Sequence, residues 1–204
     1  LITPITGMRL TVSWRYDMFY REALRFYRAC GKRLKQRFFF PRGYVRLLKN
    51  EHEIAKWHKR RRDPDMQPFL HRQAPQLNAD VIHQPENGFQ QRHAAWLDTA
   101  AYLQASRRFF ESLESCTTAD VKPEDVCDDA DGVEWSGQRF SHVIWAQGWS
   151  AEKHPLFHWV PFQSALGTIL TVQADLQAEK RILNRGCWLL PRNDGTLRAG
   201  STYE

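Results

Sequence analysis

The turn Asn193-Asp194-Gly195 constrains the fold of this chain most, because it lies between two strand-like segments, residues 187–190 and 197–202. A short turn of this composition joins neighbouring strands that run in opposite directions. Residues 44–48 and 167–172 are further strand candidates, because they are apolar runs bounded by glycine or polar residues. The sequence therefore predicts a mostly antiparallel or mixed sheet built from these four segments.

Three segments carry the signals of helices. Asp17, Asn50 and Asp98 are residue types that are favoured at helix N-caps. Apolar side chains follow Asp17 and Asp98 at the three- and four-residue steps of an amphipathic helix, and Glu53 follows Asn50 at the spacing of a capping box. The predicted helices cover residues 17–34, 50–62 and 98–113.

A further apolar run, residues 142–146, predicts a buried strand that ends at Gly148. Residues 132–137 precede it with the signal of a hairpin. We expect the run and the helix that begins at Asp98 to pack together, in a layer separate from the main sheet. The fold class is therefore α+β: a mixed, largely antiparallel sheet with helices, plus a partial strand–helix layer.

The composition excludes several classes of protein. The hydrophobic content of 42% is ample for a packed core, and no apolar run approaches the ~18 residues of a membrane helix. The four cysteines form no CxxC pair and no secretory signal precedes them, so we expect free thiols and a cytoplasmic protein. Pro155 separates His154 from His158, which argues against a helix that presents both to a metal, and no metal site is predicted.

Charge is unevenly distributed along the chain. The net charge of +6 divides into +11 for residues 1–84 and −5 for residues 85–204. Such asymmetry indicates either an anionic partner for the first part or a charged contact between the two parts. The basic cluster Lys59-Arg60-Arg61-Arg62 could contact phosphates, but the solvated end of a helix explains it more simply, because no nucleic-acid-binding motif accompanies it.

The two ends of the chain have the character of an interior piece. The first residue is Leu1 rather than methionine, and the last, Glu204, directly follows a predicted strand. We therefore expect this chain to be part of a longer protein.

Several short motifs occur in an order that resembles a known family. The family is that of the glycine oxidase and sarcosine oxidase-like FAD-dependent oxidoreductases, within the D-amino-acid oxidase superfamily. The motifs are TGMRL at residues 6–10, the helix from Asp98 to Phe110, GVEW at 132–135, FSHVIWAQGWS at 140–150, PF at 161–162 with GTIL at 167–170, and LPRNDGTLRAGSTYE at 190–204.

The chain departs from that family at both ends. The family's phosphate-binding GxGxxG unit and its terminal segment, which closes over the flavin, have no counterpart here. The resemblance therefore implies the middle of such an enzyme. Residues 1–84 and 153–204 would form a substrate-binding-type region, and residues 85–152 a partial FAD-binding-type region that lacks its flanking segments.

The resemblance also implies roles for particular residues. Val121, Ala146 and Gly148 would contact FAD, since a glycine at a strand end lets backbone approach a nucleotide, although an ordinary turn explains Gly148 equally well. Apart from the resemblance, Arg9 is the best candidate for the active-site face, where it could anchor a substrate carboxylate or stabilise the reduced flavin, although a surface arginine in a basic segment explains it too. Tyr44 could line a substrate pocket, although aromatic side chains at such positions more often lie in the core. No side chain is identified as a general base.

Two functions follow from these observations. In the first, the chain is a fragment of an FAD-dependent oxidoreductase that oxidises the C–N bond of a small amine or amino acid. FAD would bind the full-length protein, and this fragment alone would retain none and be inactive. In the second, the basic first part of the chain binds nucleic acid or another polyanion. A related possibility combines the two, in which the chain belongs to a flavoenzyme that modifies tRNA. A purely structural domain is a third reading, favoured if no concave apolar pocket exists.

Overall fold

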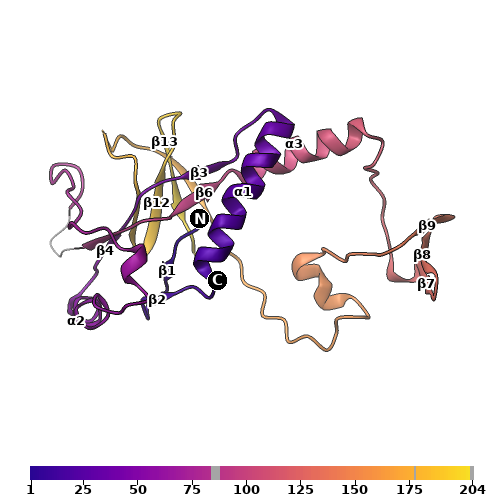
Figure 1. Ribbon diagram of the computed structural model, residues 1–204, viewed down its shortest axis with the longest axis horizontal. Helices are drawn as coiled ribbons and strands as arrows, with labels where there is room; N and C mark the ends of the chain where they lie inside the picture. Colours follow the sequence, from indigo (N-terminus) through magenta and orange to yellow (C-terminus); the bar gives the residue numbers. More distant parts are fainter. Residues whose placement is uncertain (84–87, 177, 203–204) are drawn as a thin grey trace.

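The structure is a computed structural model that describes residues 1–83, 88–176 and 178–202 (Figure 1). A six-stranded sheet forms its centre. In spatial order the strands are β10 (Leu170–Gln173), β13 (Thr196–Gly200), β12 (Cys187–Pro191), β11 (Ile182–Arg185), β4 (Tyr44–Leu47) and β5 (Gly88–Gln91).

The strand pairing confirms the predicted sheet. β12 and β13 run antiparallel, with Leu190 opposite Arg198, and Gly195 in the turn between them has φ +79°, a conformation that favours glycine. β4 and β11 form the one parallel pair among the described strands of this sheet, so the sheet is mixed. β5 and β11 were not predicted, because neither carries a strong strand pattern of its own.

The three helices form where the sequence predicts them: α1 (Tyr16–Leu34), α2 (Glu51–Arg60) and α3 (Thr99–Ser112). Asn50 and Asp98 cap α2 and α3, and their side chains accept hydrogen bonds from backbone N–H groups at 3.0 and 3.2 Å. Asp17 does not cap α1. That helix begins one residue earlier, after Arg15, and Asp17 lies in its first turn.

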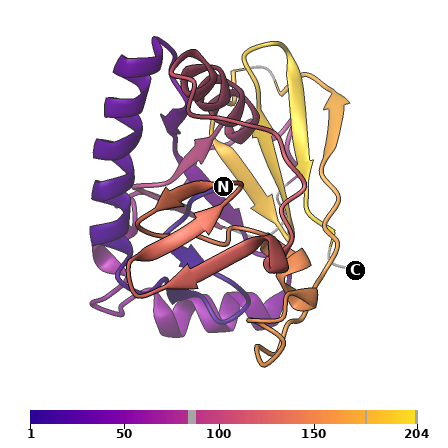
Figure 2. The same ribbon diagram turned by 90° about the vertical axis from the view of Figure 1, so that its right-hand side faces the viewer.

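Helices and short strands cover one face of the sheet (Figure 2). Trp57 of α2 stacks on Phe89 of β5, and residues of α1, β1 (Ile5–Thr6) and β2 (Thr11–Val12) belong to the same core cluster. β3 (Phe39–Pro41) pairs with β6 (Ala95–Leu97), and the 3-10 helix η1 (Gln67–Phe69) adds Phe69 to the same core. The other face of the sheet contacts apolar side chains from residues 77–82 and from Leu176.

Residues 114–169 form a second region, on the right of Figure 1. It contains the 3-10 helices η2 (Pro123–Asp125) and η3 (Gly148–Lys153). Between them lies an antiparallel meander of β7 (Val126–Asp129), β8 (Gly132–Trp135) and β9 (Gln138–Phe140), which confirms the hairpin predicted at 132–137. α3 leads into this region, and the segment after η3 leads back to β10.

The strand predicted at residues 142–146 does not form. This segment has no regular secondary structure, and Ile144 is 88% exposed. An apolar run becomes a buried strand only when another strand pairs with it, and no described strand does so here. α3 instead packs on α1, where the Tyr102 ring lies 5.3 Å from that of Tyr27.

The α+β class and the mixed, largely antiparallel sheet are confirmed. β5, which lies within the stretch expected to be of FAD-binding type, is the edge strand of the main sheet. The division at residues 84 and 153 stays a prediction. No helix within the described ranges combines the length and the apolar content needed to cross a membrane.

Candidate functional site

One face of the six-stranded sheet carries most of its polar side chains, and we call it the polar face. Successive side chains of a strand point to opposite faces, and directly paired residues share a face. Tyr44 is paired with Gln91, Arg46 with Asn184, Asn184 with Trp188, and Leu190 with Arg198. The polar face therefore carries Tyr44, Arg46, Gln91, Asn184, Trp188, Leu190 and Arg198.

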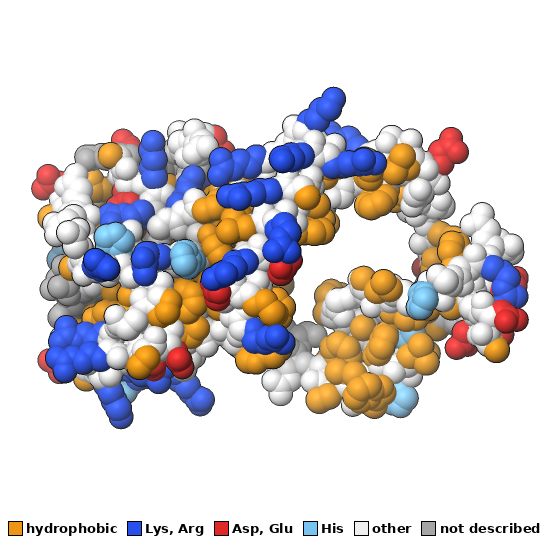
Figure 3. Space-filling model, viewed as in Figure 1, with side chains coloured by type: hydrophobic (Ala, Val, Ile, Leu, Met, Phe, Trp, Pro, Cys, Tyr) orange, Lys and Arg blue, Asp and Glu red, His pale blue; other side chains and the backbone are white. Residues whose placement is uncertain are grey.

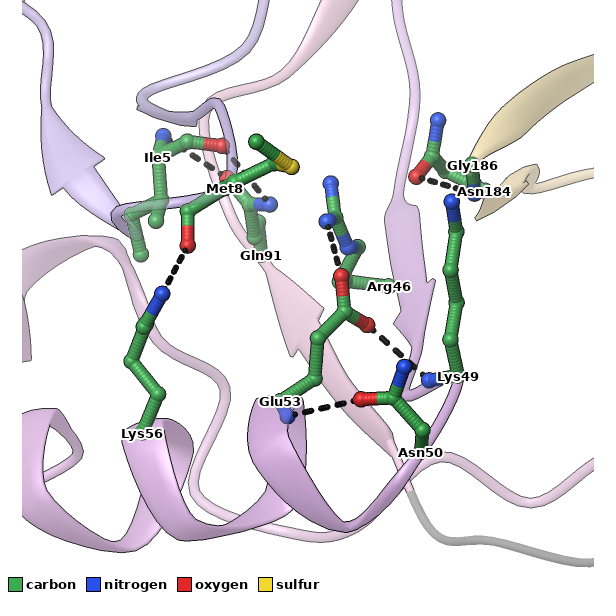
Figure 4. Close-up of polar contacts among 10 residues, drawn as sticks. All are labelled: Ile5, Met8, Arg46, Lys49, Asn50, Glu53, Lys56, Gln91, Asn184 and Gly186. Carbon is green, nitrogen blue, oxygen red and sulfur yellow. Dashed lines mark hydrogen bonds and ion pairs between the residues drawn. The ribbon is translucent and has the colours of Figure 1, made fainter.

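At β4, an ion pair with a helix residue covers the polar face. The Arg46 guanidinium lies 3.0 Å from Glu53 of α2, and the two side chains are only 11% and 10% exposed (Figure 4). The second Glu53 oxygen accepts the Lys49 N–H at 2.9 Å. Burial by itself would raise the pKa of Glu53, but the Lys49 N–H and the Arg46 guanidinium outweigh it and hold the pKa below its usual range. This pair fastens α2 to the sheet.

Gln91 attaches the N-terminal segment to the same face. Its side chain is 1% exposed, and Oε1 accepts hydrogen bonds from the Thr3 hydroxyl and the Ile5 N–H, each at 2.9 Å. Nε2 donates to the Ile5 carbonyl at 3.3 Å (Figure 4). Gln91 thereby positions β1 and the turn that follows it. The sequence by itself does not indicate this role for Gln91, because its partners lie 86 to 88 positions away in the chain.

The two predicted substrate residues lie in different surroundings. Arg9 is exposed on the turn between β1 and β2, where Lys56 of α2 donates to the Met8 carbonyl at 2.9 Å. Tyr44 is 5% exposed and packs with Trp96 and other apolar side chains in the core. Burial raises the pKa of Tyr44 to about 12, so its hydroxyl stays neutral. The structure does not bring the two together, and their roles remain predictions.

The polar face is open at β10 and around Arg198 of β13, whereas Leu190 of β12 is buried. Arg198 of β13 is exposed there, paired with Thr171 of β10 and Leu190 of β12. The Trp188 ring lies against the backbone of Gly200, since a Cβ on that glycine would come within 2.7 Å of the ring. An aromatic surface thus lies on the same face as an exposed cation. The alternation of Thr196, Leu197 and Arg198 could have placed this arginine on the polar face from sequence.

A stack of side chains ties the β12–β13 turn to β3 and β6. The Phe40 ring stacks on the Trp96 ring at 4.5 Å between centroids. The Arg37 guanidinium lies 4.9 Å from the centroid of the Phe40 ring, and the Arg192 guanidinium lies 5.0 Å from that of the Trp96 ring. Arg42 donates to the Pro191 carbonyl at 2.6 Å. Its pKa is lowered by burial and by the neighbouring Arg192 and Arg37. These contacts hold the turn from which the Arg198 strand begins.

The three residues predicted to contact FAD lie in the second region. Val121 is half-buried just before η2, and Ala146 is exposed. Gly148 begins η3 with φ +59°, and a Cβ there would meet no atom within 4 Å. The neighbouring Gln147 Oε1 is buried and has no hydrogen-bond partner in the described chain. An open backbone position beside an unused acceptor fits one edge of a dinucleotide, although the described residues hold no glycine-rich strand–helix turn for its pyrophosphate.

The described residues form no cluster of metal ligands. Among residues 1–83, 88–176 and 178–202, no three His, Cys, Asp or Glu side chains lie close enough together to hold a metal ion.

Known structures share this fold. Glycine oxidase from Geobacillus kaustophilus matches with a TM-score of 0.68 at 15% identity, over 93% of this chain and 55% of that one. Iminodiacetate oxidase from Chelativorans sp. BNC1 matches with a TM-score of 0.61 at 11% identity, over 100% and 61%. NikD, described as an unusual amino acid oxidase essential for nikkomycin biosynthesis, matches with a TM-score of 0.53 at 14% identity, over 100% and 60%.

The chain thus spans between 55% and 61% of the length of these structural relatives. At such low identities the similarity establishes the fold, and the family rests on the sequence. Residues 6–204 match the sequence model of the family described as FAD dependent oxidoreductase. Because that match covers nearly the whole chain, the chain belongs to the FAD-dependent oxidoreductase family of the D-amino-acid oxidase type.

Proposed function

We propose that the protein containing this chain oxidises the C–N bond of a small amine or amino acid. The observation that carries this proposal is the open part of the polar face, where Arg198 is exposed on the same face as the Trp188 ring. A guanidinium on a sheet face can hold a carboxylate in two parallel hydrogen bonds. The names of the structural relatives, oxidases of glycine, iminodiacetate and amino acids, support a substrate of this kind.

Each residue of the polar face has a proposed part in binding. Arg198 holds the substrate carboxylate, and Trp188 supplies an apolar wall that excludes water. Gln91 fixes β1, so the turn with Arg9 keeps one position relative to the sheet. Arg9, exposed on the turn between β1 and β2, is the second proposed substrate contact, and neutral Tyr44 supports the polar face from the core. All of these roles are in binding and positioning the substrate, and none of these residues is assigned as a general base.

When bound, FAD would take up the hydride that leaves the substrate carbon next to nitrogen, so that the C–N bond becomes the C=N bond of an imine. Gly148 and Ala146 would present backbone to one edge of it, with Val121 near the adenine. The chain would supply the substrate sheet and this edge, and further segments of the protein would complete the FAD-binding region. The exposure of apolar side chains in the second region supports a role for such further segments. Trp149 and Trp159 are largely exposed in this chain, and the added segments would cover them.

The experiment mixes the full-length protein with candidate substrates in the absence of oxygen. Reduction of the flavin is monitored by the loss of its visible absorbance. Glycine, sarcosine, iminodiacetate and larger amino acids are compared with 2-hydroxy acids. We expect the compounds with a C–N bond to bleach the flavin and the hydroxy acids to leave it oxidised. Reduction by hydroxy acids alone would overturn the proposal.

Arg198→Ala tests the carboxylate contact. Loss of a charged hydrogen bond costs about 1.5–3 kcal/mol, which lowers kcat/KM for amino acids about 10- to 150-fold. Amines without a carboxylate should lose little. Arg185→Ala is the matched control, since Arg185 is an exposed arginine of β11 on the opposite face of the sheet. Equal losses for acids and amines, or for both variants, would exclude Arg198 as the anchor.

A further inference from the structure

Five cations form a row along α1 and its C-cap, and we call this row the basic stripe. Its members are four and three residues apart, which places them on one face of a helix. With a rise of 1.5 Å per residue, the row is about 21 Å long. The basic stripe consists of Arg21, Arg25, Arg28, Lys32 and Lys35.

The basic stripe borders a cavity with an apolar floor. The cavity has a volume of about 980 Å³, and Arg37 adds a sixth cation to its lining. Leu24, Tyr27 and Phe39 form the floor, and the rings of the last two stack at 5.6 Å. Figure 3 shows blue side chains along α1 with orange surface between them. Cations thus surround a partly aromatic surface.

Most of the positive charge of the stripe is not neutralised by the described part of the chain. Asp17 pairs with Arg21 at 2.8 Å and Glu22 with Arg25 at 3.0 Å, and these exposed pairs contribute little. For Arg28, Lys32 and Lys35 no described carboxylate lies within ion-pair distance. The stripe therefore attracts an anion most strongly along Arg28, Lys32 and Lys35.

We propose that the basic stripe binds single-stranded nucleic acid. A row of regularly spaced cations matches a chain of regularly spaced phosphates. The half-buried Tyr27 ring, which is backed by the buried Phe39 ring, gives an unpaired base a surface on which to stack, which an acidic peptide would leave unused. At the N-terminal end of α1, Trp14 is 75% exposed and the Arg15 guanidinium lies 5.2 Å from its ring, which adds a second stacking surface. This activity is separate from the proposed oxidation.

The first test is the salt dependence of binding. A fluorescein-labelled 20-nucleotide oligouridylate is titrated with the full-length protein and followed by anisotropy. For four or more phosphates neutralised on a single strand, log K falls with log salt at a slope of about −2.8 or steeper. The affinity should therefore fall about 50-fold between 50 and 200 mM salt. An absence of binding at 50 mM salt would overturn the proposal.

The second test reverses charge on the stripe. R28E/K32E should weaken binding at least about tenfold and reduce the slope by about 1.4, since two cations are lost. K59E/R62E is the matched control, because it changes the net charge equally on the exposed end of α2 and beyond, and it should stay within about twofold. R28Q/K32Q, a milder change, provides a second readout if the reversed variant does not fold. Equal loss in both reversed variants would contradict a defined site.

The third test separates nucleic acid from other polyanions. Trp14→Ala should weaken oligouridylate binding by about 1–3 kcal/mol of stacking, about five- to 150-fold, and leave polyglutamate binding unchanged. Polyglutamate of the same length should compete poorly for the stripe. If it competes as well as the oligonucleotide, the stripe serves an acidic protein partner and the proposal is wrong.

Discussion

The sheet region and the second region bury their apolar side chains to very different extents. In the sheet region, Val45, Ile182 and Phe38 are completely buried. In the second region, residues 114–169, the buried side chains are few, and one is His154, which lies between the rings of Trp145 and Phe157. The sheet region thus carries its own core, whereas the second region needs other surfaces to cover it.

The two regions also differ in what holds their backbones in place. The sheet is held by backbone pairing over six strands and by α1 and α2 packed on it. The meander β7–β9 has three short strands, and its β9 residues are exposed. A small sheet without a packed face is stable only with a neighbour. In the full-length protein, we expect the remaining FAD-binding segments to be that neighbour.

The largest effect concerns the cofactor. We expect the isolated 204-residue chain to fold but to purify colourless and without oxidase activity, because the described residues offer a dinucleotide one edge and no pyrophosphate turn. The full-length protein should be yellow. The measurement is the visible spectrum before and after addition of FAD and gel filtration. A stoichiometric flavin spectrum retained by the isolated chain would contradict this expectation.

Two isoleucines test the comparison directly. Ile182→Ala removes a fully buried side chain from the sheet and should lower the free energy of unfolding by about 2–5 kcal/mol. Ile144→Ala in the second region should change it by less than about 0.5 kcal/mol in the isolated chain. In the full-length protein the Ile144 variant should cost more, if other segments cover it. Urea unfolding gives the change in unfolding free energy for each variant, in the isolated chain and in the full-length protein. Equal changes for the two variants in the isolated chain would show that the two regions do not differ in this way.

Breaking the Arg46–Glu53 pair should have a somewhat smaller effect. Glu53→Gln leaves a guanidinium that is 11% exposed without its carboxylate, which costs about 3 kcal/mol. Glu22→Gln is the control, since its pair with Arg25 is exposed and worth less than about 1 kcal/mol. Denaturant midpoints report both. Similar small shifts in the two variants would show that the buried pair does not fasten α2.

Gly200→Ala should cost about 2 kcal/mol, because the new Cβ would press on the Trp188 ring and overpack the site. In a Trp188→Ala background the same change should cost much less. A double-mutant cycle of unfolding free energies measures this coupling. Additive costs would mean that another contact requires the glycine.

The smallest effect is on the pH dependence of stability. The pKa of Glu53 is lowered in the folded chain, so the ionised carboxylate is stabilised relative to the unfolded chain. That contribution is fully present above the unfolded pKa and is lost as pH falls through the lower folded pKa. The acid-side decline in unfolding free energy should therefore be shallower in Glu53→Gln. An unchanged slope would show that other carboxylates govern acid stability.

Much of the local structure follows from short stretches of sequence. The caps of α2 and α3 lie at Asn50 and Asp98, because each side chain bonds a backbone N–H only three residues away. The β12–β13 hairpin follows from its Asn-Asp-Gly turn for the same reason. The family could also be recognised in advance, since the order of its motifs is a property of the sequence.

Long-range pairing decided the rest. β5 is a strand because it pairs with β4, which is about 40 residues earlier in the chain. Residues 142–146 remain without regular structure because no described strand pairs with them. Gln91 became a positioning residue only through its bonds to Thr3 and Ile5. Sequence alone thus determined the elements whose hydrogen bonds close within a few residues. The tertiary structure decided those whose backbone groups and polar side chains must find partners far along the chain.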